Sequence, residues 1–181
     1  MYRDERVLLD AVTLFAEHGL GRNDGVILVA TAPHLRAIDA RLGAADLPVD
    51  GLRTRGQLLA VPADEFLAAF MKDRLPHAAL FEAAVLALIR KLRSAGYTHV
   101  RVFGEMVDLL WKDDLPAATR LEELWNGIVE AEQIALLCSY SHGTAEAGGP
   151  ARMPSWLRAL HTHVIPPEAD GDARAPASAR G

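Results

Sequence analysis

THVRVFGEMVDLLWKDDLPAATRLEELWN, residues 98–126, is the stretch that decides the fold. It opens with a short run of branched and aromatic residues, 99–103, which predicts a β-strand. Gly104 then breaks the strand and Glu105 stands where a helix would begin, since the apolar residues that follow have helical spacing. Open α/β sheets bind ligands at the carboxyl ends of their strands. We therefore look for a binding site around Glu105.

The composition indicates one globular domain, because 181 residues, half of them apolar and 24% charged, suffice for a substantial core. The net charge of −5 argues against a general DNA- or RNA-binding role, which requires a concentrated basic surface. No apolar run reaches the roughly 20 residues of a membrane span. The charged start has no signal-peptide pattern, and a single cysteine excludes an internal disulfide. We expect a cytoplasmic protein.

Strands and helices are predicted to alternate along the chain. The predicted strands are residues 25–30, 57–61, 99–103 and 133–140. The predicted helices are residues 6–18, a helix that starts after Thr31, one from 62 through 71, one over 76–95 and one from 116 to about 131, with a polar connection at 47–56. This alternation predicts a three-layer α/β domain whose mainly parallel central sheet has helices on both faces.

The turn after residues 25–30 is where a phosphate-binding loop of the GxxxxGK[ST] type would stand. The chain has ATAPHLRA there, without a glycine or a Lys-Ser/Thr pair, so we expect neither tight binding nor hydrolysis of a nucleoside triphosphate. Thr31 and the N–H groups of the following helix can still attract an anion. His34 lies at the same helix start, either as a partly exposed first-turn residue or as a ligand contact.

FGEMVDLLW, LEELWN and LLCSY resemble the MEDS family (methanogen/methylotroph, DcmR-type sensory domain), and so do ILVATAPHLRAI, FMKD and HTHVIPPE. The resemblance is collinear over residues 2–168. It implies a sensory module of bacterial or archaeal signalling proteins, with a RecA/KaiC-like domain that has lost its nucleotide-binding loop. From the residues alone, Glu105 is either a pocket carboxylate or a glutamate that stabilises a helix start. The resemblance favours the pocket role and implies a binding role for His34.

Aromatic and polar residues further along supply the other wall of the expected pocket. Trp111 either grips an apolar ligand or packs in the core. On the next helix Glu122 and Asn126 share a face, and Glu123 points about 100° away, so only one of the two acids can line the pocket. The residues leave open which of the two acids lines the pocket, and Glu123 is named here as the candidate. Tyr140 places a hydroxyl near the end of its strand.

Catalytic and metal-binding motifs are missing from the sequence. There is no GxSxG and no obvious converging pair of carboxylates. Cys138 lies in an apolar strand without a base, so we expect an inert core thiol. His161 and His163 form an HxH pair without a third ligand, so no metal site is expected. We predict no cofactor and no enzymatic activity.

The start of the chain departs from the family, which usually begins with an edge strand before an acidic turn. Residues 1–5 keep only the turn. The place of the strand is either empty or taken by the tail or by a second subunit, and an open edge favours pairing, so a homodimer is one expectation. The chain adds no DNA-binding, kinase or PAS module, so a separate kinase, anti-sigma factor or transcription factor would carry the signal.

The sequence therefore predicts that residues 1–168 form a non-catalytic sensory domain in signal transduction or transcriptional regulation, with a disordered tail at 169–181. The expected ligand is a small apolar or mixed-polarity molecule, and no membrane is involved. The predicted binding residues are Thr31, His34, Glu105, Trp111, Glu123, Asn126 and Tyr140. Two alternatives stay open: a degenerate nucleotide-binding RecA-like protein, and a protein-interaction module without a ligand.

Overall fold

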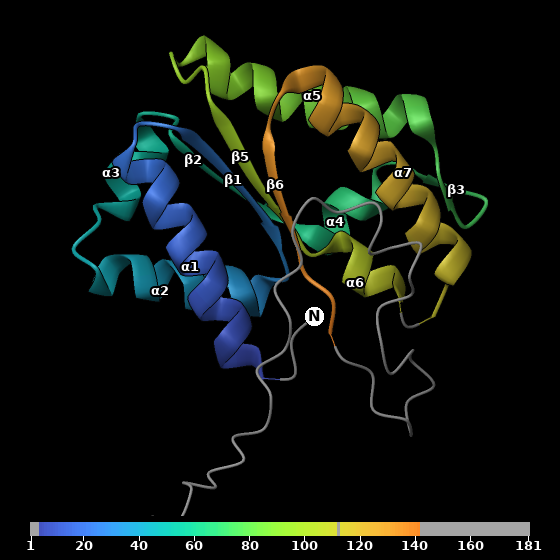
Figure 1. Cartoon of the computed structure of the whole chain (residues 1–181), viewed down its shortest axis with the longest axis horizontal. Helices are drawn as coiled ribbons and strands as arrows, with labels where there is room; N and C mark the ends of the chain where they lie inside the picture. Colours follow the sequence, from blue (N-terminus) through green and yellow to red (C-terminus); the bar gives the residue numbers. More distant parts are fainter. Residues whose placement is uncertain (1–3, 112, 142–181) are drawn as a thin grey trace, which may run out of the picture.

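The computed structural model describes residues 4–111 and 113–141. In chain order the elements are α1 (Glu5–Gly21), β1 (Gly25–Ala30), α2 (Ala32–Ala44), α3 (Val49–Thr54), β2 (Leu58–Pro62), α4 (Ala63–Ala68), β3 (Met71–Lys72), β4 (Leu75–Pro76), α5 (Ala78–Ser94), β5 (Val100–Gly104), α6 (Met106–Trp111), α7 (Leu115–Glu132) and β6 (Ala135–Cys138). Four strands build the central sheet, and β3 and β4 form a separate hairpin (Figure 1).

The central sheet is parallel throughout, with strand order β2-β1-β5-β6. The chain passes from β1 outward to β2, and then crosses back to add β5 on the other side of β1. The register places Val29 of β1 beside Gly104 of β5. The predicted parallel sheet is confirmed. Its winding direction reverses between β1 and β5, which makes the carboxyl ends of these two strands the switch point of the sheet.

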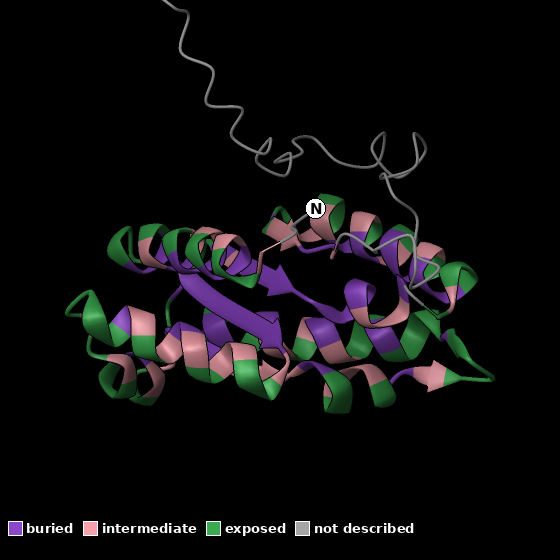
Figure 2. Ribbon diagram, turned by 90° about the horizontal axis from the view of Figure 1, so that it is seen from below, coloured by how far each residue is buried: buried purple, intermediate pink, exposed green. Residues whose placement is uncertain are grey.

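Helices cover both faces of the sheet because alternate residues of each strand point in opposite directions. In β1, Val26 and Leu28 pack on one face with α1, α2 and α3, whereas Ile27 and Val29 pack on the other with α5 and α7. All six residues of β1 are buried, as the continuous apolar run GVILVA predicts. Figure 2 shows the exposed residues on the outer sides of the helical layers. The three-layer α/β architecture is therefore confirmed.

Side-chain caps fix where the helices on either side of the sheet begin. Asp4 accepts a hydrogen bond from the Arg6 N–H at 2.8 Å and caps α1. Asp114 caps α7 by accepting from the Ala117 N–H at 3.1 Å. At the far end of α7, Gln133 adopts a left-handed conformation with φ 53° and turns the chain into β6. These capping residues fix where α1 and α7 begin and where the chain leaves α7 for β6.

The helix predicted from residue 62 through 71 is wrong for its last three residues, 69–71. It ends at Ala68, and β3 then pairs antiparallel with β4. Asp73 and Arg74 connect the two strands with φ of 49° and 66°, the positive angles that tight hairpin turns require. A glycine would have made this turn predictable from the sequence, but the pair Asp73-Arg74 contains none.

Two further boundaries differ from the sequence prediction. The polar connection predicted at 47–56 contains the short helix α3, which forms because Leu52 is buried against the α1 face of the sheet. The strand predicted over 133–140 is limited to β6, because Gln133 caps α7 and Ser139 and Tyr140 lie beyond the strand. Among the described residues, β2 and β6 are the sheet edges. The predictions for HTHVIPPE and for the tail lie outside the described residues.

Candidate functional site

Glu105 lies at the switch point, directly after β5. Its N–H donates to the carbonyl of Val29 at 2.9 Å, which continues the ladder between β1 and β5 by one step. This bond holds the Glu105 side chain beside Thr31, the residue that follows β1 and precedes α2. The parallel register of two strands thus brings together residues 74 positions apart.

The Glu105 carboxylate is almost fully buried, with 3% of the residue exposed. Its Oε2 accepts the Thr31 N–H at 2.8 Å, and its Oε1 lies 2.6 Å from His34 Nδ1. Among the described residues, no Lys or Arg side chain forms an ion pair with it. The negative charge is therefore held by a backbone N–H, by the imidazole, and by the positive end of the α2 dipole.

His34 stands between two carboxylates from different elements. Its Nδ1 faces Glu105, and its Nε2 lies 3.2 Å from Oε1 of Glu5 in the first turn of α1. Donation to both carboxylates requires a proton on each ring nitrogen, so the contacts fit the imidazolium form. The His34 side chain is 12% exposed. One ring thereby connects the starts of α1 and α2 to the end of β5.

A second polar cluster lies near the end of β6, on the side of the sheet that packs against α7. The Tyr140 hydroxyl donates to the Glu122 carboxylate, and both residues are 2% exposed. The rings of Tyr140 and Trp111 meet edge to face, with centroids 5.6 Å apart. The Asp108 carboxylate accepts from the N–H and the hydroxyl of Ser141, each at 2.7 Å. Burial, and then the neighbouring Cys138 and Glu122, raise the pKa of Tyr140.

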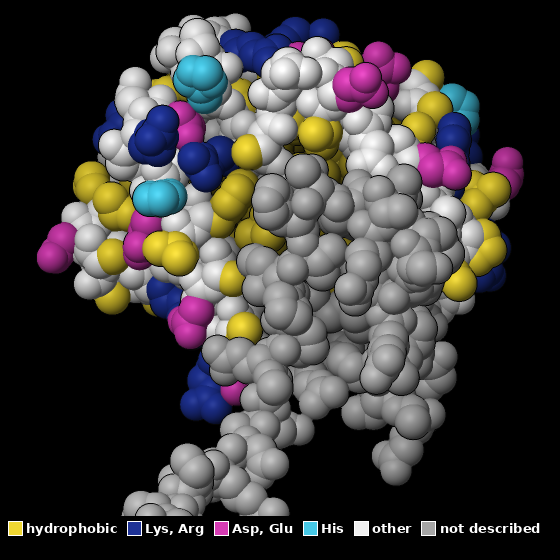
Figure 3. Space-filling model, viewed as in Figure 1, with side chains coloured by type: hydrophobic (Ala, Val, Ile, Leu, Met, Phe, Trp, Pro, Cys, Tyr) yellow, Lys and Arg dark blue, Asp and Glu magenta, His cyan; other side chains and the backbone are white. Residues whose placement is uncertain are grey.

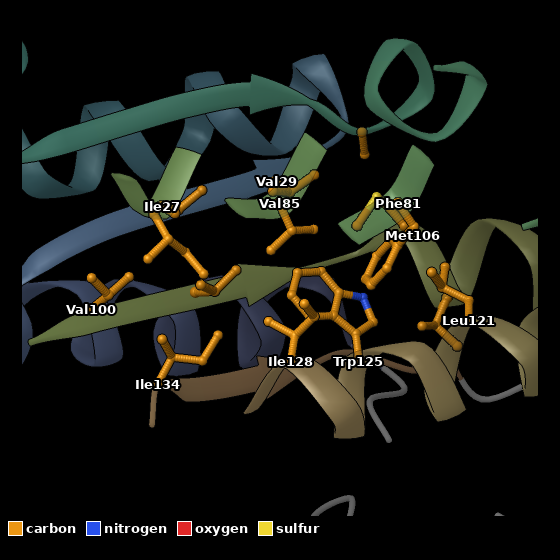
Figure 4. Close-up of a cluster of buried hydrophobic side chains, with 14 of the residues drawn as sticks. Ile27, Val29, Phe81, Val85, Val100, Met106, Leu121, Trp125, Ile128 and Ile134 are labelled. Carbon is orange, nitrogen blue, oxygen red and sulfur yellow. The ribbon is translucent and has the colours of Figure 1, made fainter. Parts of the chain in front are cut away.

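Trp111 and Trp125, two of the three tryptophans of the chain, face the interior rather than solvent. Trp111 and Trp125 are 3% and 1% exposed, and among the described residues neither indole N–H has a hydrogen-bond partner. Trp125 meets Phe81 edge to face at 5.0 Å, within the apolar cluster shown in Figure 4. Two neutral donors are therefore available inside a largely apolar region, although side chains already fill much of the space around Trp125.

The structure answers which acid of the 122–123 pair faces inward. Glu122 is buried beside Tyr140, whereas Glu123 is exposed and pairs with Arg120 at 2.9 Å. Asn126 is half-buried, on the same helix face as Glu122. Thr31 and His34 thus both contact Glu105, Trp111 and Tyr140 form a second group, and Glu123 joins neither.

Sequence reasoning did not single out Asp108 as a candidate, and it left Glu122 undecided. Glu122 carries a signal that could have decided the question, because it lies next to Leu121 and three residues before Trp125, on the buried stripe of α7. Asp108 carries no comparable signal, since an acid in the first turn of a helix is ordinarily solvated. In the fold it is buried, and its carboxylate accepts two hydrogen bonds from Ser141.

The structure also bears on possible metal ligands and on the single thiol. The part of the chain that the structure describes contains no group of three or more potential metal ligands. Burial raises the pKa of the Cys138 thiol well above its usual value, which lowers its nucleophilicity at neutral pH. A surface hollow at the amino ends of the strands is lined by Arg22, His99 and Arg101, but Arg101 is held by Asp24 at 2.7 Å. Because α1 and α7 end beside this hollow, the positive charges of Arg22 and Arg101 stabilise the negative C-terminal ends of these helix dipoles.

These features define a class of protein: a parallel α/β domain with a buried carboxylate at its switch point and no phosphate-binding loop. The family model for MEDS, the methanogen/methylotroph, DcmR sensory domain, matches residues 1–155, and the chain belongs to this family. The resemblance stated from FGEMVDLLW and LEELWN is thereby confirmed, together with a role in sensory signalling. No curated protein and no solved structure matches the chain. Among the described residues, no helix combines the length and apolar character needed to cross a membrane.

Proposed function

We propose that this MEDS domain is a non-catalytic sensory module that binds a small molecule at the carboxyl ends of β1 and β5. The observation that carries the proposal is the nearly complete burial of Glu105 at the switch point. Burying a carboxylate is costly unless it is well paired, and a Glu105 held by one histidine and one N–H lies where such sheets bind ligands.

The ligand we propose is apolar or of mixed polarity. Trp111 and Tyr140 supply aromatic surface, and the indole N–H of Trp111 is a donor without a partner among the described residues. A small molecule with one acceptor atom and an apolar body would complement this wall. Thr31, His34 and Glu105 would contact its polar end.

The signal would travel through the elements that His34 connects. A ligand that contacts Glu105 or His34 changes the bond to Glu5 and so the position of the start of α1. The size of such a shift is limited by the difference in ligand affinity between the two arrangements. We propose that a separate cytoplasmic kinase, anti-sigma factor or transcription factor reads this change. Figure 3 shows basic and acidic side chains interspersed on one face, which supports a protein partner rather than nucleic acid.

Native mass spectrometry of the protein purified from its own host tests the proposal. We expect a bound small molecule, which on return to the stripped protein raises the melting temperature. Glu105→Gln should abolish this response, whereas Glu65→Gln, an exposed first-turn glutamate of α4, should leave it unchanged. A Glu105→Gln variant that responds like the wild type would place the site elsewhere.

A protein-interaction module without a ligand is the second candidate, on a specific observation. Leu75 in β4 and Leu115 at the start of α7 are 47% and 44% exposed, on two elements that pack together, and the region around Trp125 is filled by side chains. Exposed apolar patches mark interaction surfaces. For this candidate the same mass spectrometry would show no bound small molecule in any preparation, and no compound would shift the melting temperature.

A further inference from the structure

The N-terminus of α2 already holds an anion, and that anion belongs to the chain. The first N–H groups of a helix lack partners within the helix and attract negative charge. Thr31 at the cap makes no side-chain capping bond, and Pro33 has no N–H to offer. The Glu105 carboxylate instead accepts the Thr31 N–H, with its side chain only 4% exposed. It therefore occupies the position that an external phosphate or carboxylate would need.

The charges around this position are also unfavourable for a second anion. Glu105 and Glu5 each contribute one negative charge, and His34 between them can contribute at most one positive charge. Among the described residues, no Lys or Arg forms an ion pair with either carboxylate. The group thus carries a net charge of −1 or lower, and its inner carboxylate, that of Glu105, is largely shielded from water.

We propose that Glu105 is a built-in anion that determines specificity, so that the switch-point site admits neutral or cationic ligands and rejects phosphates, carboxylates and nucleotides. His34 is the positioning residue that holds the carboxylate against α2. This inference rests on the proposed function for the ligand class, but the exclusion of anions is a property of the chain itself. It also gives a physical reason why a nucleotide would not bind here, beyond the missing glycine loop.

Chemical rescue tests the proposal. Glu105→Ala removes the carboxylate and leaves the Thr31 N–H and His34 facing a small space that formate can refill. Melting temperatures would be measured in sodium formate and in sodium chloride of equal ionic strength, with inorganic phosphate as a second probe. We expect formate to raise the melting temperature of Glu105→Ala by several degrees over chloride. The formate concentration that gives half of this rise in melting temperature should be at least tenfold lower for Glu105→Ala than for the wild type, if formate affects the wild type at all.

Two control variants separate anion replacement from general salt effects. Glu65→Ala removes an exposed glutamate from the first turn of α4 and should show no preference for formate over chloride. Glu105→Gln keeps an oxygen for the Thr31 N–H and leaves no space, so it should not be rescued either. Formate rescue of Glu105→Ala no larger than that of Glu65→Ala would overturn the proposal.

If Glu105→Ala is unfolded in chloride, recovery of its tryptophan fluorescence in formate supports the proposal. Continued unfolding in formate, while Glu105→Gln folds, contradicts it. None of these measurements needs the natural ligand, so their failure is distinct from failure of the proposed function, which native mass spectrometry decides. A natural ligand that proved to be an anion bound at Thr31 in the wild type would also overturn the inference.

Discussion

His34 offers an internal comparison, because one imidazole contacts a buried carboxylate through one nitrogen and an exposed carboxylate through the other. Its Nδ1 lies 2.6 Å from the Glu105 carboxylate, which is 4% exposed, and its Nε2 lies 3.2 Å from that of Glu5, which is 64% exposed. Double-mutant cycles measure each coupling separately. We expect the two couplings to differ, because water screens the outer pair and not the inner one.

The variants are His34→Ala, Glu105→Gln, Glu5→Gln and the two double variants that include His34→Ala. A hydrogen bond to a charged group contributes about 1.5–3 kcal/mol, whereas an exposed ion pair contributes about 0–1 kcal/mol. We therefore expect a coupling of about 2 kcal/mol with Glu105 and below about 0.5 kcal/mol with Glu5. For a domain of this size, about 2 kcal/mol corresponds to roughly 4–8 °C in Tm.

Urea unfolding followed by tryptophan fluorescence, to which the buried Trp111 and Trp125 contribute, gives the free energies by linear extrapolation. Salt at about 1 M shortens the Debye length to about 3 Å, so it should remove the outer coupling and leave the inner one. Equal couplings for the two carboxylates would refute the reasoning. So would an inner coupling that disappears with salt, since water would then reach Glu105.

Packing and ionisation give three further expectations. Gly25→Ala should lower the free energy of unfolding by about 1–3 kcal/mol, because the added Cβ would lie 2.9 Å from a buried leucine side chain. Gly43→Ala, which meets nothing within 4 Å, should raise it by about 0.5–1 kcal/mol, and urea titrations of this pair decide the question. Phe81→Ala should lower the free energy of unfolding by about 3–5 kcal/mol. Leu14→Ala, at a side chain that is 63% exposed, should lower it by less than about 0.5 kcal/mol. Similar losses for the two variants would contradict the placement of the core. Tyr140 has a raised pKa and stays protonated when folded, while the unfolded chain ionises near its usual value of about 10. Stability should therefore fall as pH rises through about 10, and Tyr140→Phe should lessen this fall in urea titrations between about pH 8 and 11.

The sheet was predictable because its signals are local and strong. The continuous run GVILVA is typical of a strand covered on both faces, and Gly104 marks where β5 ends. The contact of Thr31 and His34 with Glu105 follows from the same logic, since parallel strands bring their carboxyl ends together. Whether these three residues bind a ligand stays a prediction.

The missed features depend on rotation and on short elements, which sequence patterns report poorly. Glu122 and Glu123 differ only in their direction around α7, and this direction is set by how Trp125 packs against Phe81. The hairpin of β3 and β4 turns through Asp73-Arg74 without glycine, and α3 spans six residues, too few to show a helical period. A three-dimensional contact decides each of these cases.

The site also has a place in the order of folding. Its bonds join residues 74 and 71 positions apart, so no fragment that stops before residue 105 can contain it. Contacts of such long sequence separation form late and slowly. A molecule that binds there would therefore recognise only chains in which β5 has paired with β1. If a ligand binds there as proposed, its presence during synthesis should raise the yield of native protein.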